Sequence, residues 1–291
     1  RGRAHLTTKR REPWLFGDSI TKRVRGAVFA RYQLLPMWYT LAAEWAWRGL
    51  PLIRPIWYND LGDVQAYDYA DEHFFVGDAL LVRGPKPGNT KLDVYLPLGE
   101  WFDYWDERAA ARHGGSAFQI DPHPDHVPVF ARSGHILMKK MRPRRSTGAM
   151  VGDPYTLVAY GAPARGRIYI DDGASHDFKA GAYIYDELEF DGKALRARAA
   201  ELPATAPQSM RNQLAVPTAG LRIERVVLLG LPKKPTAVRC NKCGELVDAS
   251  GARDLRFTAA LVAEGTTWTV TVKDPAVHLG GQYDWALEVL Y

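Results

Sequence analysis

The sequence predicts an α/β segment, the C-terminal end of a (β/α)8 barrel, followed by two all-β sandwich domains. Two observations support this fold class. Apolar residues between Asp18 and Arg48 recur at helical spacing and precede the short apolar run 52–57, and a helix followed by a buried strand is the repeating unit of such barrels. After Asp60, short runs rich in β-branched and aromatic residues alternate with Gly, Pro, Asp and Asn turns, which is typical of sandwiches.

The helical segment carries signals for its start, its end and an interruption. Asp18 can cap the first turn and Gly49 can end the last one in a left-handed conformation. Pro36 lacks a backbone N–H, so we expect a kink or a break into two helices there. The run 52–57 is apolar on both faces, as expected of a buried parallel strand.

The strand signals divide the rest of the chain. They lie at 74–82, 94–96, 101–104, 127–130, 156–160, 167–170, 183–190, 221–229, 268–272 and 285–290. The basic stretch 139–146 is the best candidate for a solvated boundary between two sandwiches. We therefore expect the last part of the barrel at 1–64, a proximal β-sandwich at 65–146 and a distal β-sandwich at 147–291.

Composition narrows the class of protein. The chain has 291 residues, of which 46% are hydrophobic and 24% charged, as in ordinary globular proteins of two or three domains. The net charge of +5 is spread along the chain, so no nucleic-acid partner is expected. No apolar run reaches the roughly 20 residues that span a bilayer, and the start lacks the apolar core of a signal peptide. We expect no membrane partner, and any targeting segment would lie outside this chain.

No complete catalytic motif is present. Acid–base hydrolysis needs two carboxyl groups with different pKa values, and the nearby candidates are Glu12, Glu44, Asp60 and Asp63. Glu12 lies beside arginines, where an ion pair is expected, and Glu44 sits in the middle of the predicted helix. None of these acids forms a convincing pair.

The other conspicuous acids and the cysteines have structural explanations. Asp171 and Asp172 follow a predicted strand and precede a glycine, as in a tight turn. Cys240 and Cys243 form a single Cys-x-x-Cys, which supplies half of the ligands of a closed zinc site. We expect a turn with free or locally bridged thiols there, and neither a metal nor a cofactor.

Three aromatic residues, Trp101, Tyr104 and Trp105, cluster on a predicted strand. Aromatic pairs are common in sandwiches, so core and interdomain packing is expected. Stacking against a carbohydrate is the alternative.

The chain opens on a polar, arginine-rich segment before the predicted helix. Such a loop is typical of the mouth of a barrel, so we expect the chain to begin within an active-site loop. Arg1, Arg3 and His5 offer hydrogen-bond donors for sugar hydroxyls. A basic, disordered terminus is an equally good explanation of these three residues.

Ordered segments along the chain carry a family resemblance. They are 8–14, reading Thr-Lys-Arg-Arg-Glu-Pro-Trp, and 31–40, 52–57, 71–82, 94–97, 101–103, 127–134, 142–146, 171–173 and 223–227. Together they resemble the C-terminal third of glycoside hydrolase family 31, and most closely its glucosidase II branch. The likeness covers nearly all of the chain to about residue 238 and is weaker beyond Cys240.

The resemblance implies a (β/α)8 barrel followed by proximal and distal β-sandwiches. It also implies retaining hydrolysis of α-glucosidic bonds by an aspartate nucleophile and an aspartate acid/base. Both aspartates lie on earlier barrel strands of the family, upstream of this chain. We therefore expect the chain alone to be inactive, with no catalytic residue of its own.

The resemblance also implies which residues support the sugar site. The family's opening loop usually reads Arg-x-His-x-His, and its first histidine hydrogen-bonds the sugar. Here Arg3 stands at that position, His5 matches the second histidine, and Thr7 replaces the usual aspartate. We expect Arg3 and His5 to bind substrate, although the permanent charge of arginine makes normal contact doubtful. The residues expected to shape the loop are Arg1, Arg10, Arg11 and Trp14.

The function implied is trimming of terminal glucose from N-linked glycans in the lumen of the endoplasmic reticulum. The implied partners are the upstream catalytic half of the same enzyme, a glucosylated glycan substrate and a regulatory β subunit. Two alternatives remain open. One is a different family 31 α-glucosidase or an α-xylosidase, and the other is a non-catalytic, carbohydrate-binding β-sandwich protein.

Overall fold

Helices form the first part of the chain in the computed structural model, which describes residues 7–85, 88, 90–211, 221–241, 252–262, 265–280 and 285–291. The short helix η1 (Pro13–Phe16) precedes α1 (Asp18–Gln33) and α2 (Leu35–Arg48). The predicted break is confirmed, because Pro36 lies in the first turn of α2. Gly49 ends α2 in the left-handed region, with φ of 71°. The predicted cap is wrong: Gly17 is the N-cap of α1, and Asp18 lies within its first turn.

A six-stranded sheet follows, which we call the small sheet. Its strand order is β1 (Ile53–Pro55), β2 (His73–Val76), β3 (Leu80–Arg83), β8 (Val129–Arg132), β5 (Glu100–Asp103) and β6 (Arg112–His113). The two-stranded sheet of β4 (Leu92–Leu96) and β7 (Ser116–Ile120) covers one face of it. Two short helices, η2 (Ile56–Asn59) and η3 (Val64–Tyr69), connect β1 to β2.

Two strand predictions in this region need correction. The run 52–57 is not a parallel strand buried on both faces, because β1 pairs antiparallel with β2 and Ile53 is 56% exposed. The predicted strand 74–82 is a hairpin of β2 and β3. Its turn is at Gly77, whose φ is +63° and where a Cβ would lie 2.8 Å from Cδ2 of Leu41. Glycine therefore permits both the turn and the close approach of α2.

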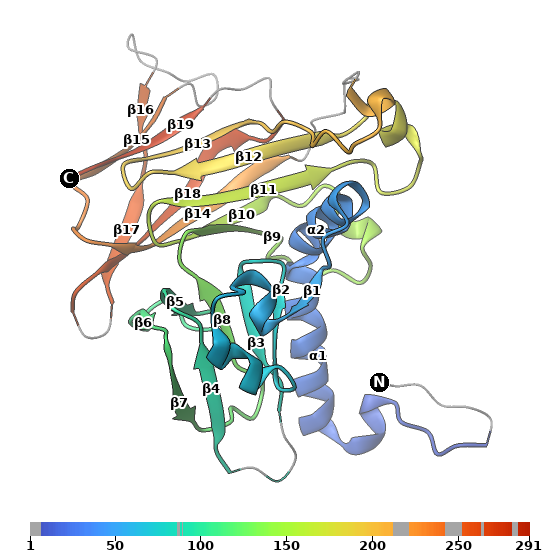
Figure 1. The fold of residues 1–291 in the computed structure, drawn as a ribbon. Coiled ribbons are helices and arrows are strands. Elements are labelled where there is room, and N and C mark those ends of the chain that lie inside the picture. Colours follow the sequence, from blue (N-terminus) through green and yellow to red (C-terminus); the bar gives the residue numbers. More distant parts are fainter. Residues whose placement is uncertain are drawn as a thin grey trace.

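An eleven-stranded sheet, the large sheet, occupies most of the remaining chain (Figure 1). Its order is β16 (Ala252–Asp254), β15 (Ala237–Asn241), β19 (Ala286–Leu290), β13 (Ala194–Ala199), β12 (Ile184–Phe190), β11 (Ala164–Ile170), β9 (His135–Lys139), β10 (Tyr155–Tyr160), β14 (Arg222–Leu231), β18 (Trp268–His278) and β17 (Phe257–Leu261). Three short helices, η4 (Gly148–Met150), η5 (Asp177–Ala180) and η6 (Gln208–Arg211), lie in its connections.

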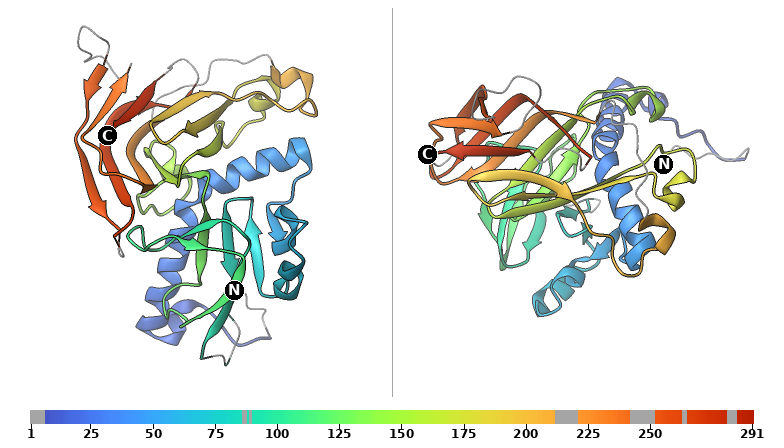
Figure 2. Two further views of the ribbon diagram at one scale, coloured as in Figure 1. Left: turned by 60° about the vertical axis from the view of Figure 1, so that its left-hand side comes forward. Right: turned by 90° about the horizontal axis from the view of Figure 1, so that it is seen from above.

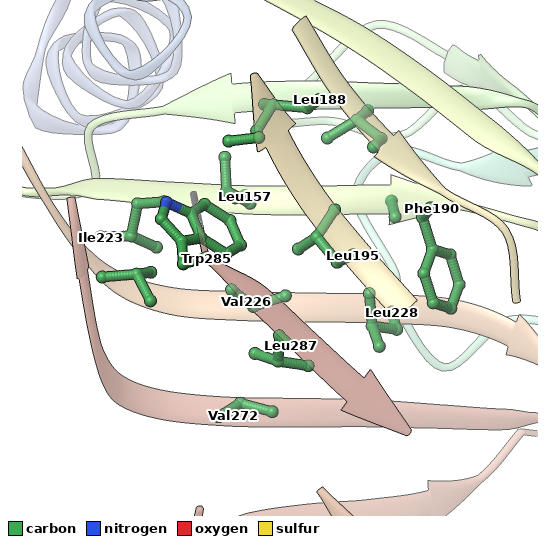
Figure 3. Close-up of a cluster of buried hydrophobic side chains, with 14 of the residues drawn as sticks. Leu157, Leu188, Phe190, Leu195, Ile223, Val226, Leu228, Val272, Trp285 and Leu287 are labelled. Atoms are coloured by element: carbon green, nitrogen blue, oxygen red, sulfur yellow. The ribbon is translucent and has the colours of Figure 1, made fainter. Parts of the chain in front are cut away.

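The large sheet curls so that its two halves enclose one core (Figure 3). Leu188 and Leu195 come from one half, Val226 and Val272 from the other, and Trp285 lies among them. Each of these side chains is at most 2% exposed. A single curled sheet thus forms both layers of the distal sandwich.

The inner strands β2, β3, β8 and β5 of the small sheet are buried on both faces, because successive side chains of a strand point to opposite sides. Trp101 of β5 and Phe130 of β8 pack toward β4 and β7, whereas Phe102 and Ala131 pack toward α2 and the large sheet. Helix α2 lies between the two sheets (Figures 1 and 2). The expected division at residue 146 stays a prediction, and β9, which precedes it, pairs within the large sheet.

Candidate functional site

The loop expected to meet substrate is described only from Thr7 onward, so Arg1, Arg3 and His5 lie outside the described residues. Arg10 donates a hydrogen bond from Nε to Oε1 of Glu12 at 3.0 Å, which confirms the expected ion pair. Hydrogen bonds from the backbone and from Arg10 hold the pKa of Glu12 below its usual value. Arg11 is exposed nearby. The sugar contacts expected of this loop stay predictions.

An exposed apolar face follows that loop. Trp14 in η1 is 63% exposed, and no residue of α1 is buried. Thr21 of α1 donates from Oγ1 to the carbonyl oxygens of Pro13 and Gly17, which holds η1 against the helix. The exposed residues of this face, here called the N-terminal apolar face, are Trp14, Leu15, Phe16, Ile20, Val24 and Val28.

A cavity of about 250 Å³ lies where α2 meets the large sheet. We call it the α2 pocket. Its wall comes from α2, from the turn between β2 and β3, and from β9, β11 and β12. Met37, Leu41 and Met138 line it with apolar atoms. The charged and polar side chains that line it are Glu44, Asp78, His135, Arg165, Arg167 and Glu187.

Glu44 is the buried carboxylate of the α2 pocket, with 6% of its surface exposed. Its Oε1 accepts a hydrogen bond from Nε of Arg167 at 2.6 Å and another from the hydroxyl of Tyr185 at 2.9 Å. Burial alone would lower the pKa of Arg167, but the charge of Glu44 outweighs it and raises that pKa. A charged pair at this junction therefore joins α2 to β11 and β12.

The rim of the α2 pocket is polar. Nε2 of His135 lies 3.8 Å from Oδ1 of Asp78, and Nδ1 of His135 lies 3.3 Å from the carbonyl oxygens of Arg132 and Ser133. Those two carbonyls favour the tautomer with hydrogen on Nδ1, because a carbonyl only accepts. Burial would raise the pKa of Asp78, but the nearby imidazole of His135, when protonated, holds it well below its usual value.

The turn expected at Asp171 and Asp172 is confirmed. The Asp171 carboxylate accepts a hydrogen bond from the backbone N–H of Gly173. The Asp172 carboxylate accepts hydrogen bonds from the backbone N–H groups of Ala174 and Ser175. Tyr39 of α2 and Tyr169 of β11 also donate their hydroxyls to Asp171, at 2.6 and 2.9 Å. This turn thus holds α2 against the large sheet.

The aromatic cluster divides between core and surface. Trp101 is fully buried and Tyr104 is buried. Trp105 is half exposed, and its ring stacks on His126 with centroids 4.5 Å apart. The expected core packing therefore holds for Trp101 and Tyr104.

Among the described residues, no group of three or more His, Cys, Asp or Glu side chains is placed to hold a metal ion. No helix in the described part of the chain is long and apolar enough to cross a membrane. Cys240 is disulfide-bonded, whereas Cys243 lies outside the described residues.

Sequence reasoning missed the α2 pocket. The spacing of Glu44 from Met37 and Leu41 places it on the apolar face of the helix, which indicates a buried carboxylate rather than a catalytic acid. That spacing is the one feature of the sequence that indicates a buried position for Glu44. Asp78, His135 and Arg167 come from three separate elements, and nothing local in the sequence brings them together.

Comparison with known families identifies the class of protein. The glycosyl hydrolase family 31 C-terminal domain matches residues 49–137, and the TIM-barrel domain of the same family matches residues 1–41. The chain therefore belongs to glycoside hydrolase family 31. These matches confirm the predicted fold class, a barrel end followed by β-sandwiches.

Within that family the chain is homologous to glucosidase II and related α-glucosidases. A probable glucan 1,3-alpha-glucosidase of Arabidopsis thaliana is 36% identical over 100% of this chain and 30% of its own length. The neutral alpha-glucosidase AB of Mus musculus is 34% identical over 99% of this chain and 29% of its own. The glucosidase II alpha subunit, solved with DNJ bound, matches with a TM-score of 0.85 at 25% identity, covering 98% of this chain and 31% of that one. The chain thus spans about 30% of the length of these curated relatives.

Proposed function

We propose that the chain is the C-terminal portion of a retaining α-glucosidase whose catalytic aspartates lie upstream of it. The observation that carries this proposal is the likeness of 98% of the chain to a glucosidase II alpha subunit, of which it covers 31%. Retaining hydrolysis needs two carboxyl groups about 5–5.5 Å apart. Two of the candidate acids have other partners, since Glu12 is hydrogen-bonded to Arg10 and Glu44 to Arg167.

The upstream half of the same enzyme is the proposed partner of the N-terminal apolar face. Soluble proteins rarely expose a contiguous apolar patch of this kind without a covering partner. The face lies on η1 and α1, within the residues that match the family's barrel domain. A barrel completed by upstream strands would cover it.

Terminal glucose on N-linked glycans is the proposed substrate. Support comes from the glucosidase II relatives, one of which is solved with Glc1Man2 bound. Arg3 and His5 are the proposed substrate contacts of this chain, with Arg1, Arg10, Arg11 and Trp14 shaping the loop around them.

The lumen of the endoplasmic reticulum and a regulatory β subunit complete the proposal. A solved relative is an ER glucosidase II heterodimer of the catalytic subunit and the binding domain of the regulatory subunit. The disulfide at Cys240 agrees with an oxidising compartment such as this lumen.

Hydrolysis by the whole protein that contains this chain tests the proposal. We expect it to release glucose from an α1,3-linked glucose disaccharide and from a monoglucosylated glycan. Because a retaining enzyme keeps the anomeric configuration, NMR should show the α-anomer of glucose forming first. The chain 1–291 alone should release none, because both catalytic acids come from elsewhere. Turnover by the chain alone that is lost on replacing one of its own acids would contradict this. An aryl α-xyloside is offered in parallel, and release of xylose from it without release of glucose from the other substrates would indicate an α-xylosidase. A whole protein that is folded but hydrolyses none of them would indicate a binding protein.

Replacing Arg3 tests the expected sugar contact. In the whole enzyme, Arg3→His should restore a neutral donor and raise kcat/KM by about tenfold, which corresponds to about 1.4 kcal/mol of transition-state stabilisation. Arg11→His is the matched control, since Arg11 is expected only to shape the loop, and should change kcat/KM little. An unchanged or lower kcat/KM for Arg3→His would show that the arginine is irrelevant or adapted to the site.

A further inference from the structure

The α2 pocket holds polar atoms that the fold itself leaves unused. Within the described residues, both hydrogen bonds to Glu44 go to Oε1, and Oε2 accepts none. Arg167 uses Nε for that contact, and among the same residues its Nη1 and Nη2 donate none. Both side chains line the cavity. An acceptor and two donor groups that can still form hydrogen bonds therefore belong to side chains that line the same cavity.

The charges around this space disfavour simple ions. The carboxylates of Glu44 and Asp78 would repel an anion, and the guanidinium of Arg167 would repel a cation. Glu187 and Arg165 also reach the lining, but each is paired with an opposite charge, Arg198 at 2.6 Å and Glu189 at 2.7 Å. A neutral ligand that both donates and accepts hydrogen bonds satisfies this arrangement best.

Size and wall chemistry narrow the class of ligand. A volume of about 250 Å³ is below the roughly 300–1,000 Å³ of pockets for drug-sized molecules, so the ligand is small. Met37, Leu41 and Met138 offer an apolar wall to C–H groups, while every hydroxyl of a sugar can donate to Glu44 and accept from Arg167. We propose that the α2 pocket binds one sugar ring or a polyol of that size.

This binding would couple two parts of the fold. The ligand would contact α2 through Glu44 and β11 through Arg167. It would therefore bind only while helix and sheet are packed together, and its binding would stabilise that packing. The proposal is independent of the proposed hydrolysis, because it concerns occupancy of this cavity and is read without an activity assay.

Methionine methyl NMR tests it directly, with D-glucose as the probe. In the intact protein labelled with ¹³C at methionine methyls, glucose should shift the signals of Met37 and Met138 saturably. We expect a dissociation constant on the order of 1 mM, as suits so small a ligand. Met150 and Met210, which do not line the pocket, should not move.

Two variants and one control decide the assignment. Asp78→Asn and Arg167→Gln should each weaken glucose binding about five- to tenfold, and Asp78→Asn keeps the test valid if loss of the Glu44 partner unfolds the second variant. Asp125→Asn, an exposed aspartate paired with Arg23, is the matched control and should leave the affinity unchanged. Absence of saturable shifts, equal shifts at all four methionines, or binding of glycine or inorganic phosphate in place of glucose would each overturn the proposal.

Discussion

Glu44 and Lys139 are charged residues with only 6% of their surface exposed. The contacts that compensate the buried charge differ between them. Glu44 is paired with Arg167. Lys139 has its Nζ 4.0 Å from the centroid of the Tyr104 ring. Burial lowers the pKa of Lys139 to about 8, although the charge of Glu107 opposes that change. A cation–π contact alone thus leaves much of the cost of burying the ammonium uncompensated.

Lys139→Met should raise the free energy of unfolding at pH 7 by about 1–3 kcal/mol. A fall in pKa from 10.5 to about 8 corresponds to a cost of roughly 3 kcal/mol for keeping the folded-state ammonium charged. The variant removes this cost but also loses the cation–π contact, which is worth up to about 2 kcal/mol. Because the folded-state pKa is the lower one, the unfolded chain binds more protons between pH 8 and 10.5. The stability of the parent therefore rises across that window, and the gain from the variant should shrink by pH 10. Urea unfolding at both pH values measures this.

Lys140→Met is the matched control for that experiment. Lys140 is also buried, but its Nζ donates to the carbonyl oxygens of Met150 and Val151 at 2.7 and 3.0 Å. Its replacement should lower the free energy of unfolding by about 1–3 kcal/mol, because two carbonyls lose their donor. Equal effects of the two substitutions would contradict the difference drawn between these neighbouring lysines.

Local chemistry made some residue roles predictable. The Asp171 turn and the Arg10–Glu12 pair rest on residues within two positions of each other. The partner of Glu44 is 123 positions away, and the sequence carries no sign of so distant a contact. The parts of the site predictable from sequence were therefore the local ones.

At the scale of elements, the break between α1 and α2 was predictable because proline acts within its own turn. The hairpin of β2 and β3 was not, since its apolar pattern continues across Gly77. The apolar run 52–57 predicts a parallel strand, but β1 pairs antiparallel with β2, because an apolar pattern on both faces does not determine the direction of pairing. Pairing direction depends on neighbours that lie elsewhere in the chain.

Gly166→Ala should destabilise the protein by more than about 3 kcal/mol, since overpacking against backbone admits little relief. Gly166 lies in β11, and a Cβ there would overlap the backbone oxygen of Ile136 in β9. Gly26→Ala in α1 is the control, because a Cβ at Gly26 has open space around it. That change should stabilise the helix by about 0.5–1 kcal/mol. Thermal unfolding of both variants compares them, and a tolerated Gly166→Ala would rule out the tight approach of β9 and β11.

For the whole molecule, alternation along the strands predicted sandwiches correctly but could not give their construction. The two layers around the distal core belong to a single curled sheet. Within this sheet β10 pairs with β14 in parallel, although the two strands are well separated in sequence. Strand order of this kind depends on contacts across the chain rather than on periodicity within each strand.

Co-expression of this chain with the upstream part of the same protein should give one complex on gel filtration. The N-terminal apolar face supplies the expected contact, because burying it removes apolar surface from water. Val24→Asp should weaken the complex, whereas Leu261→Asp, at an exposed apolar position of β17, should leave it intact. Two separately eluting, folded pieces would refute this assembly.

The position of β19 determines when the large sheet can close. β19 is inserted between β13 and β15 (Figure 1), yet residues 286–290 are synthesised long after β13 ends at Ala199. At about 5–20 residues per second, a ribosome needs on the order of 4–17 s to cover that interval. During that time the open edge of β13 can pair with another chain. A nascent chain of this protein therefore passes through an aggregation-prone stage that chaperones would have to protect.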